Sequence, residues 1–239
     1  MAAPFKTWTV LPHAPLTTLD DNLLTVVGEI KLPVGAFPRR MTIVRLKDRR
    51  LVTFSAIALD EEEMACIENF GTPAFLIVPN AIHRQDARIW KDRYPNVQVG
   101  CPAGARDNVE KIVAVDTTAP DFGDANVRFV TIPGTLERES ALYVEGATGA
   151  TLVLNDIIGN IRNARGFGGW LLRMMKFAGD EPHIPRPVKA KIIDSKAALR
   201  TQFLAWAADP KLKRIVVSHG DIIDMDPRGV LTKLADTLS

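Results

Sequence analysis

The chain has 239 residues, of which 46% are hydrophobic and 24% are charged, and its formal net charge is +2. These values exclude intrinsic disorder, and a chain of this length buries roughly 70–75% of its unfolded surface without disulfides or structural metals. Acidic and basic residues are interleaved along the sequence, so we expect no nucleic-acid partner.

The two cysteines, Cys66 and Cys101, are too few and too far apart for a disulfide framework or a paired-cysteine metal site. Both lie in apolar surroundings, and we expect them to be small core residues. The N-terminus lacks the pattern of a signal peptide, and no stretch approaches 18 uncharged apolar residues. We therefore expect a cytoplasmic protein with no membrane span.

The first half of the chain predicts an arm followed by strands and helices. Residues 1–20 contain three prolines and no hydrophobic period, which indicates an arm lying over the domain. Apolar runs separated by turn-forming residues then predict an antiparallel meander. The apolar run at 74–78 is too short for a helix and predicts a strand buried on both faces. The predicted strands are 23–27, 41–46, 51–54, 74–78 and 97–101, and the predicted helices are 60–71 and 86–94.

The second half has the same organisation, with strands predicted at 127–132, 141–145, 151–154 and 215–218 and helices at 196–207 and 227–238. No linker rich in Gly, Ser or Pro separates the two halves. We therefore predict one α/β domain over residues 1–239, with two layered sheets and helices outside them.

Polar residues follow the buried strands at four junctions, where α/β proteins usually place their chemistry. The junctions read PNAIHRQDA (79–87), IPGTLERESALYV (132–144), LVLNDIIGN (152–160) and VVSHGD (216–221). Their order and spacing resemble the metallo-β-lactamase-like superfamily over nearly the whole chain, and more narrowly an uncharacterised bacterial family with altered junctions. The resemblance implies an αββα sandwich of two mixed sheets with helices on the outer faces.

Part of that superfamily's metal-binding pattern matches this sequence. Asp156 stands at the position of the aspartate that bridges two metals, and His219 stands at the position of the last histidine ligand. The Pro133–Gly134 pair also matches, but Thr135 replaces the histidine that follows it. The resemblance therefore implies a degenerate centre rather than a dinuclear one.

The first metal-binding loop of the superfamily, His-x-His-x-Asp-His, aligns with residues 80–86 in two ways. One register places the motif on Asn80, Ile82, Arg84 and Gln85, and no usual ligand survives. The other register places it one residue later and keeps His83 and Asp86. The sequence leaves the two registers open, and an inward-pointing Arg84 would put a positive charge where a cation should lie.

The second register predicts a mononuclear metal site from His83, Asp86, Asp156 and His219. Two histidines with one or two carboxylates suit zinc, iron(II) or manganese. Such an ion would support hydrolysis of a small ester, lactone, amide or phosphoester, with His219, Asp156 and His83 as catalytic residues. We assign substrate binding to Asn80, Arg84, Thr135 and Trp170. The alternative is that the histidines bond to loops and the aspartates cap helices.

A metal-free site is a further possibility. His83 and His219 would then act as acid and base, while Arg84 holds an anionic substrate. Glu137, Arg138 and Glu139 could face the same pocket or be simply solvated. A serine nucleophile is not expected, because Ser55, Ser140 and Ser218 lack the Gly-x-Ser-x-Gly setting.

Residues 164–182 contain many large apolar side chains, including Trp170, between glycine-rich ends. A lid, an oligomer contact, a membrane-surface helix and an ordinary core helix all fit this pattern, and a lid or a dimer contact fits best among the functional roles. The segment supports a second hypothesis of a different class. In that hypothesis the chain is a non-catalytic interaction protein, a homodimer for example, that uses residues 164–182 as its contact.

Overall fold

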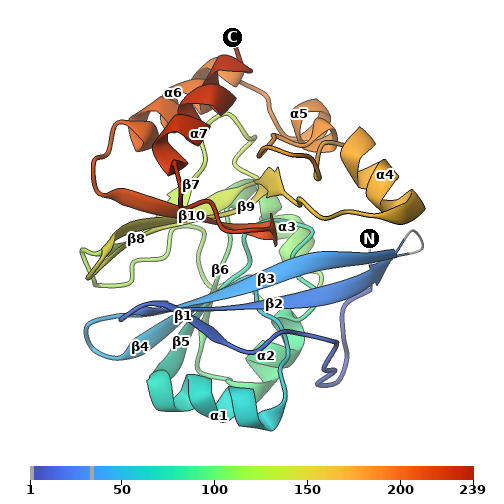
Figure 1. Cartoon of the computed structure of the whole chain (residues 1–239). Helices are drawn as coiled ribbons and strands as arrows, with labels where there is room; N and C mark the ends of the chain where they lie inside the picture. Colours follow the sequence, from blue (N-terminus) through green and yellow to red (C-terminus); the bar gives the residue numbers. More distant parts are fainter. Residues whose placement is uncertain (1–2, 33–34) are drawn as a thin grey trace.

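The computed structural model describes residues 3–32 and 35–239, which form two sheets with helices on their outer faces (Figure 1). The first sheet has the order β1–β2–β3–β4–β5–β6, and the second has the order β10–β9–β8–β7. The strands are β1 (Thr17–Asp20), β2 (Leu23–Leu32), β3 (Gly35–Arg45), β4 (Arg50–Phe54), β5 (Thr72–Ile77), β6 (Gln98–Gly100), β7 (Val127–Thr131), β8 (Ser140–Gly146), β9 (Gly149–Asn160) and β10 (Leu212–Gly220). The helices are α1 (Glu61–Phe70), α2 (Ala87–Arg93), α3 (Arg106–Val109), α4 (Gly166–Met174), α5 (Arg186–Lys191), α6 (Lys196–Ala207) and α7 (Pro227–Asp236).

Both sheets are mixed. The pairs β4–β5, β5–β6 and β9–β10 are parallel, and the other neighbours are antiparallel. In Figure 1, α1 and α2 lie beneath the first sheet, while α6 and α7 cover the second. The predicted αββα sandwich is confirmed.

Side chains that alternate along the central strands divide the core into three layers. In β5, Phe75 and Ile77 pack between the sheets, while Leu76 packs with the helices outside. In β9, Val153 faces the other sheet and Leu152 faces the helices. Because residues of a strand point alternately to its two faces, a strand covered on both sides is apolar throughout. The prediction of strands buried on both faces is thus confirmed.

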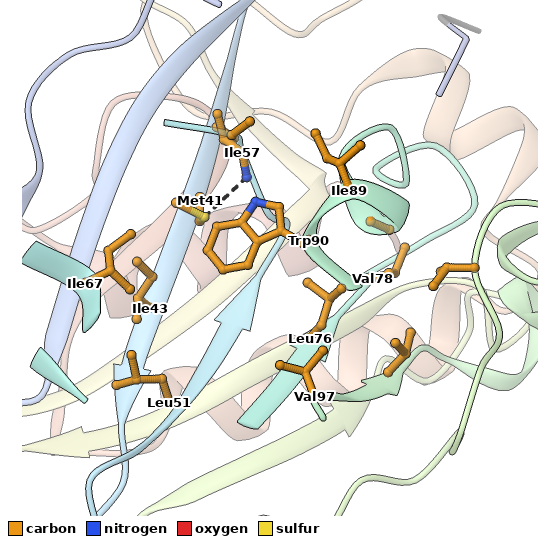
Figure 2. Packing of buried hydrophobic residues seen from close by; sticks show 14 of the residues in the cluster. Met41, Ile43, Leu51, Ile57, Ile67, Leu76, Val78, Ile89, Trp90 and Val97 are labelled. Atoms are coloured by element: carbon orange, nitrogen blue, oxygen red, sulfur yellow. Dashed lines mark hydrogen bonds between the residues drawn. The ribbon is translucent and has the colours of Figure 1, made fainter. Parts of the chain in front are cut away.

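The outer layer of the first sheet is packed around Trp90 of α2, which is 1% exposed (Figure 2). Leu76 and Val97 lie on one side of its ring, and Met41 and Ile57 lie on the other. Phe5 and Trp8 of the N-terminal segment pack against the same cluster. The last four residues of the predicted arm instead form β1, since they pair with β2.

Local signals in the sequence account for the helix ends. The Asp60 side chain accepts a hydrogen bond from the backbone N–H of Glu63 and caps α1, and Ser195 and Asp226 cap α6 and α7 in the same way. One prediction on α1 is wrong. Cys66 lies on the exposed face of this helix, whereas Cys101 is buried as expected.

The sheets are joined at the edge where β4, β5 and β10 end. Arg40 of β3 is buried, and its guanidinium donates to the carbonyl oxygens of Val217 (3.0 Å) and Gly220 (2.8 Å) in the second sheet. Burial lowers the pKa of Arg40 to about 10, although the charge of Asp221 opposes the shift. These bonds link β3 of the first sheet to the end of β10 in the second.

Candidate active site

Three of the predicted site residues meet at this edge. The Nε2 atoms of His83 and His219 are 3.1 Å apart, and the Asp156 Oδ1 atom lies 2.7 Å from His219 Nε2 and 3.3 Å from His83 Nε2. All three side chains are at least nine-tenths buried. They come from three separate junctions, so only the folded chain brings them together.

A short turn after β5 positions His83. The Asn80 side-chain oxygen accepts hydrogen bonds from the backbone N–H groups of Ile82 (2.8 Å) and His83 (2.9 Å). The Asn80 amide nitrogen donates to Asp156 Oδ2 (2.7 Å) and to Glu139 Oε1 (2.7 Å). The structure thus places one residue from each predicted register, Asn80 and His83, in the same site.

A bulge in β9 positions Asp156. Val217 of β10 pairs with Leu154, but His219 pairs with Gly159, so residues 155–158 of β9 loop out of the regular pairing. Bulges of this kind redirect side chains next to functional sites. Here the bulge lies directly across from His219.

The hydrogen bonds around His219 define the chemistry of the centre. Its Nδ1 atom lies 2.7 Å from the carbonyl oxygen of Pro38, which can only accept, so Nδ1 carries a hydrogen. In the neutral ring, Nε2 then presents a lone pair to the Asp156 carboxylate. A metal ion bound between these two atoms would remove the repulsion.

The ionisation of the centre follows from burial and charge. Burial alone would raise the pKa of Asp156, but His83 and His219 outweigh it and hold that pKa well below its ordinary value. Burial lowers the pKa of His83, although the charge of Asp156 opposes the shift. Asp156 is therefore the permanent anion of the site.

Glu139 is a site residue that the sequence marked only as one of three charged residues near the pocket. It is fully buried, with Oε1 bonded to Asn80 and no partner for Oε2 among the described residues. Burial raises its pKa well above the ordinary value, and the charge of Asp156 raises it further. No pattern in the sequence separates it from Glu137, because burial of one carboxyl in a charged loop is a tertiary effect.

Ser55 and Arg39 also reach the site. Ser55 Oγ lies 2.8 Å from His83 Nδ1. Arg39 is buried, and its guanidinium is bonded to Asp86. Arg39 was not predicted as a site residue. The signal that could have marked it is the Arg39–Arg40 pair next to the apolar run 41–46, since charged residues in a buried strand need a specific partner.

Four residues predicted for the site stay outside the group of three. Asp86 lines the same cavity as that group, but its carboxylate is bonded to Arg39 and to the backbone N–H of Ala58 (3.0 Å). The Arg84 guanidinium donates to the carbonyl oxygen of Asn108. Thr135 is buried and donates to the Ile132 carbonyl oxygen (2.7 Å) within its own turn. Trp170 is 56% exposed on α4, where it stacks on Phe167.

Two cavities meet at the centre. One has a volume of about 180 Å³, and its walls include Phe37, Ala56 and the three central side chains. The other has a volume of about 390 Å³ and extends past Glu139 toward α5. Asp156 and Phe177 line both cavities, so a molecule at the centre has space on two sides.

No helix in the described part of the chain is long and apolar enough to cross a bilayer. No family model and no curated protein sequence matches the chain.

Solved structures do match it over nearly its whole length. The metallo-β-lactamase FIM-1 from Pseudomonas aeruginosa, described in its mono-zinc form, has a TM-score of 0.63 at 12% identity and covers 95% of this chain and 96% of its own. DIM-1, a metallo-β-lactamase exposed to ceftazidime, has a TM-score of 0.64 at 9% identity, with 97% and 100% covered. A metallo-β-lactamase from Hirschia baltica has a TM-score of 0.60 at 10% identity, with 94% and 98% covered.

At such low identity the likeness concerns the fold. The chain has the metallo-β-lactamase fold, as the resemblance of its strand-end junctions implied.

Proposed function

We propose that the protein is a hydrolase of a small ester, lactone, amide or phosphoester, with a single divalent ion held by His83, Asp156 and His219. The observation that carries the proposal is the convergence of two imidazole nitrogens and one carboxylate oxygen, all within 4.8 Å of one another. Three protein ligands with an open position are the usual pattern of a catalytic metal site.

The donor set fits a metal. The three atoms are separated by 2.7–3.3 Å, close to the spacing of roughly 3.4 Å that ligands about 2.1 Å from a tetrahedral ion would have. The Pro38 carbonyl oxygen orients the His219 ring from behind, as partners of metal-binding histidines commonly do. Asp86 is omitted from the set, because Arg39 holds its carboxylate.

A divalent ion at this point would supply a Lewis acid that activates water and polarises a carbonyl or phosphoryl group. Zinc, iron(II) and manganese all accept these donors. The mono-zinc form of FIM-1 supports a one-metal centre on this fold. Asn80 would hold the free oxygen of Asp156, and the walls of the two cavities would position the substrate.

The test is metal content and hydrolysis by the wild type and two histidine variants. The chain has four histidines, and His183 lies outside the centre, so His183→Ala is a matched control for His219→Ala. We expect near-stoichiometric metal in the wild type and in His183→Ala, and less than about a tenth as much in His219→Ala. Hydrolysis of a panel of nitrophenyl esters, lactones and phosphoesters should fall in parallel. Equal metal content in all three proteins would overturn the proposal.

A second candidate function rests on α4. Phe167, Trp170 and Met174 are 72%, 56% and 45% exposed, and the rings of Phe167 and Trp170 are 5.7 Å apart. Exposed apolar groups that cluster in this way are typical of contact surfaces. In this alternative the chain is a binding protein that self-associates through α4. Light scattering would show a dimer that Trp170→Ser converts to a monomer, and a monomeric wild type would exclude the alternative.

A further inference from the structure

Ser55 lies at a sharp turn of the backbone and has an unusual backbone conformation. It directly follows β4 at the strand-end edge, with φ at 57°. This left-handed region is uncommon for a residue other than glycine, and strained positions of this kind cluster at active sites. The backbone N–H of Ser55 donates to the Ile77 carbonyl oxygen (3.0 Å), which fixes the turn against β5.

His83 connects Ser55 to the anion of the site. Ser55 Oγ is 2.8 Å from His83 Nδ1, and His83 Nε2 on the far side of the ring is 3.3 Å from Asp156 Oδ1. A hydroxyl, an imidazole and a carboxylate in this order form the constellation that activates a serine, which is recognised by geometry rather than by sequence position.

The cavity in front of Ser55 is lined by Ser55, Ala56 and Arg39, and also by the carboxylates of Asp86 and Asp156. Asp86 takes one nitrogen of the Arg39 guanidinium. The backbone N–H of Ala56, directly after the serine, has no acceptor within residues 3–32 and 35–239. Arg39 is buried, and its Nε and Nη2 atoms have no partner in that part of the chain. A free N–H after the nucleophile and a nearby cation suit a developing oxyanion.

We propose that Ser55 is a nucleophile that forms a covalent acyl-enzyme with small esters when the centre holds no metal ion. Ser55 Oγ forms a bond to the carbonyl carbon of the ester and gives its proton to His83 Nδ1. The C–O bond to the alcohol breaks, and the alcohol leaves with that proton. Water, deprotonated by His83, then cleaves the acyl-serine, releases the carboxylic acid and restores the Ser55 hydroxyl.

This serine chemistry belongs to the same hydrolase class as the proposed function but needs no ion. An active serine and an occupied metal centre exclude each other. An ion bound to the His83 Nε2 lone pair leaves the hydrogen of the neutral ring on Nδ1. Nδ1 then donates to Ser55 and cannot take its proton. Occupation of the centre should therefore switch the serine off.

The test is labelling by an alkyl fluorophosphonate, followed by intact mass spectrometry and peptide mapping. Serine attack forms an O–P bond and releases fluoride. We expect a single adduct on Ser55 in metal-stripped wild-type protein, and at least tenfold slower labelling after incubation with Zn²⁺. His83→Gln should label at least a hundredfold more slowly, the lower range for loss of a general base.

Two serine variants complete the test. Ser55→Ala keeps the same Cβ atom at the positive φ and should take up no label, and Ser55→Gly serves if circular dichroism shows that Ser55→Ala is unfolded. Ser218→Ala is the matched control, since Ser218 is buried and, within the described part of the chain, its hydroxyl has no hydrogen bond to a histidine; it should label at the wild-type rate.

The outcomes separate the two proposals. No adduct on folded, metal-stripped wild type, an adduct elsewhere, or labelling unaffected by His83→Gln would overturn the serine proposal. If metal binding and metal-dependent hydrolysis persist in that case, the proposed function stands alone. Labelling of Ser55 that Zn²⁺ leaves unchanged, in protein that binds no metal, would retain the nucleophile and reject both the metal centre and the switch.

Discussion

The helix-covered face of the first sheet and the edge that carries the candidate site bury different kinds of side chain. Around Trp90 the buried cluster consists of apolar side chains supplied by α1, α2, α3 and the strands of the first sheet. Within the described residues, one polar atom of that cluster, the Trp90 indole nitrogen, lacks a partner, whereas at the site edge buried atoms of Arg39, Glu139 and Asn155 lack partners. Buried polar groups without partners destabilise a fold, and natural proteins tolerate them mainly at functional sites. The apolar layer therefore supplies mainly hydrophobic burial, whereas the site edge holds charged and amide groups whose burial is costly.

The largest expected effect lies in the apolar layer. Leu76→Ala removes a buried side chain of β5 that packs in the cluster around Trp90 of α2. We expect a loss of about 3 kcal/mol in the free energy of unfolding. Met225, which is 95% exposed, is the control, and Met225→Ala should change the same quantity by less than about 0.5 kcal/mol. Urea unfolding followed by circular dichroism measures both. Equal losses in the two variants would show that the apolar layer does not stabilise the fold more than the surface does.

An intermediate effect is expected where a buried carboxylate is fully bonded. Asp20 at the end of β1 accepts hydrogen bonds from Thr148 and from the backbone N–H of Asp21. Burial alone would raise the pKa of Asp20, but these bonds outweigh it and lower the pKa. Because the folded pKa is below the unfolded one, the stabilisation is complete above the unfolded value of about 3.9 and is lost as the pH falls through the folded value.

Asp20→Asn should therefore lower the free energy of unfolding by about 1.5 kcal/mol at pH 7, the range of a hydrogen bond to a charged group. The difference from wild type should shrink below about pH 4, as Asp20 of the wild type takes up a proton. Thermal unfolding at pH 3, 5 and 7 measures it. A difference independent of pH would show that the carboxylate charge has no part in this bonding.

The smallest effect should have the opposite sign. Glu139→Gln removes a buried carboxyl beside Asp156 while keeping an oxygen for the Asn80 amide. We expect metal-stripped protein to gain up to about 1 kcal/mol of stability at pH 7, since residues selected for function are often destabilising. Chemical denaturation with Asn126→Ala, at a turn outside the site, as control tests this. A loss above about 1 kcal/mol would mean that Glu139 stabilises the edge.

Much of the fold follows from local patterns in the sequence. Continuous apolar runs predicted β5 and the centre of β10, and the helix predicted at 196–207 has the observed bounds of α6. The partial match of four junctions to one superfamily then implied the αββα sandwich, which the solved structures support.

The site was less accessible to such reasoning. Asp156, His83 and His219 were singled out because they stand at strand-end junctions and because these junctions resemble, in part, the metal-binding pattern of one superfamily. Asp86 occupies a similar position, yet its side chain turns to Arg39. Ser55 was set aside because it lacks a sequence motif. Its contact with His83 depends on two turns, the one after β4 and the one held by Asn80, and no motif records such a contact.

The sequence by itself determined which segments are buried strands and capped helices, because hydrophobic period and capping act over a few neighbouring residues. It also determined that polar groups stand where strands end. The tertiary structure decided which of those groups face one another. A bulge in β9, the pairing of β9 with β10 and the Arg40 bonds between the sheets bring Asp156, His219 and His83 together. Contacts between residues far apart in the chain leave no local pattern, and so only the folded molecule reveals them.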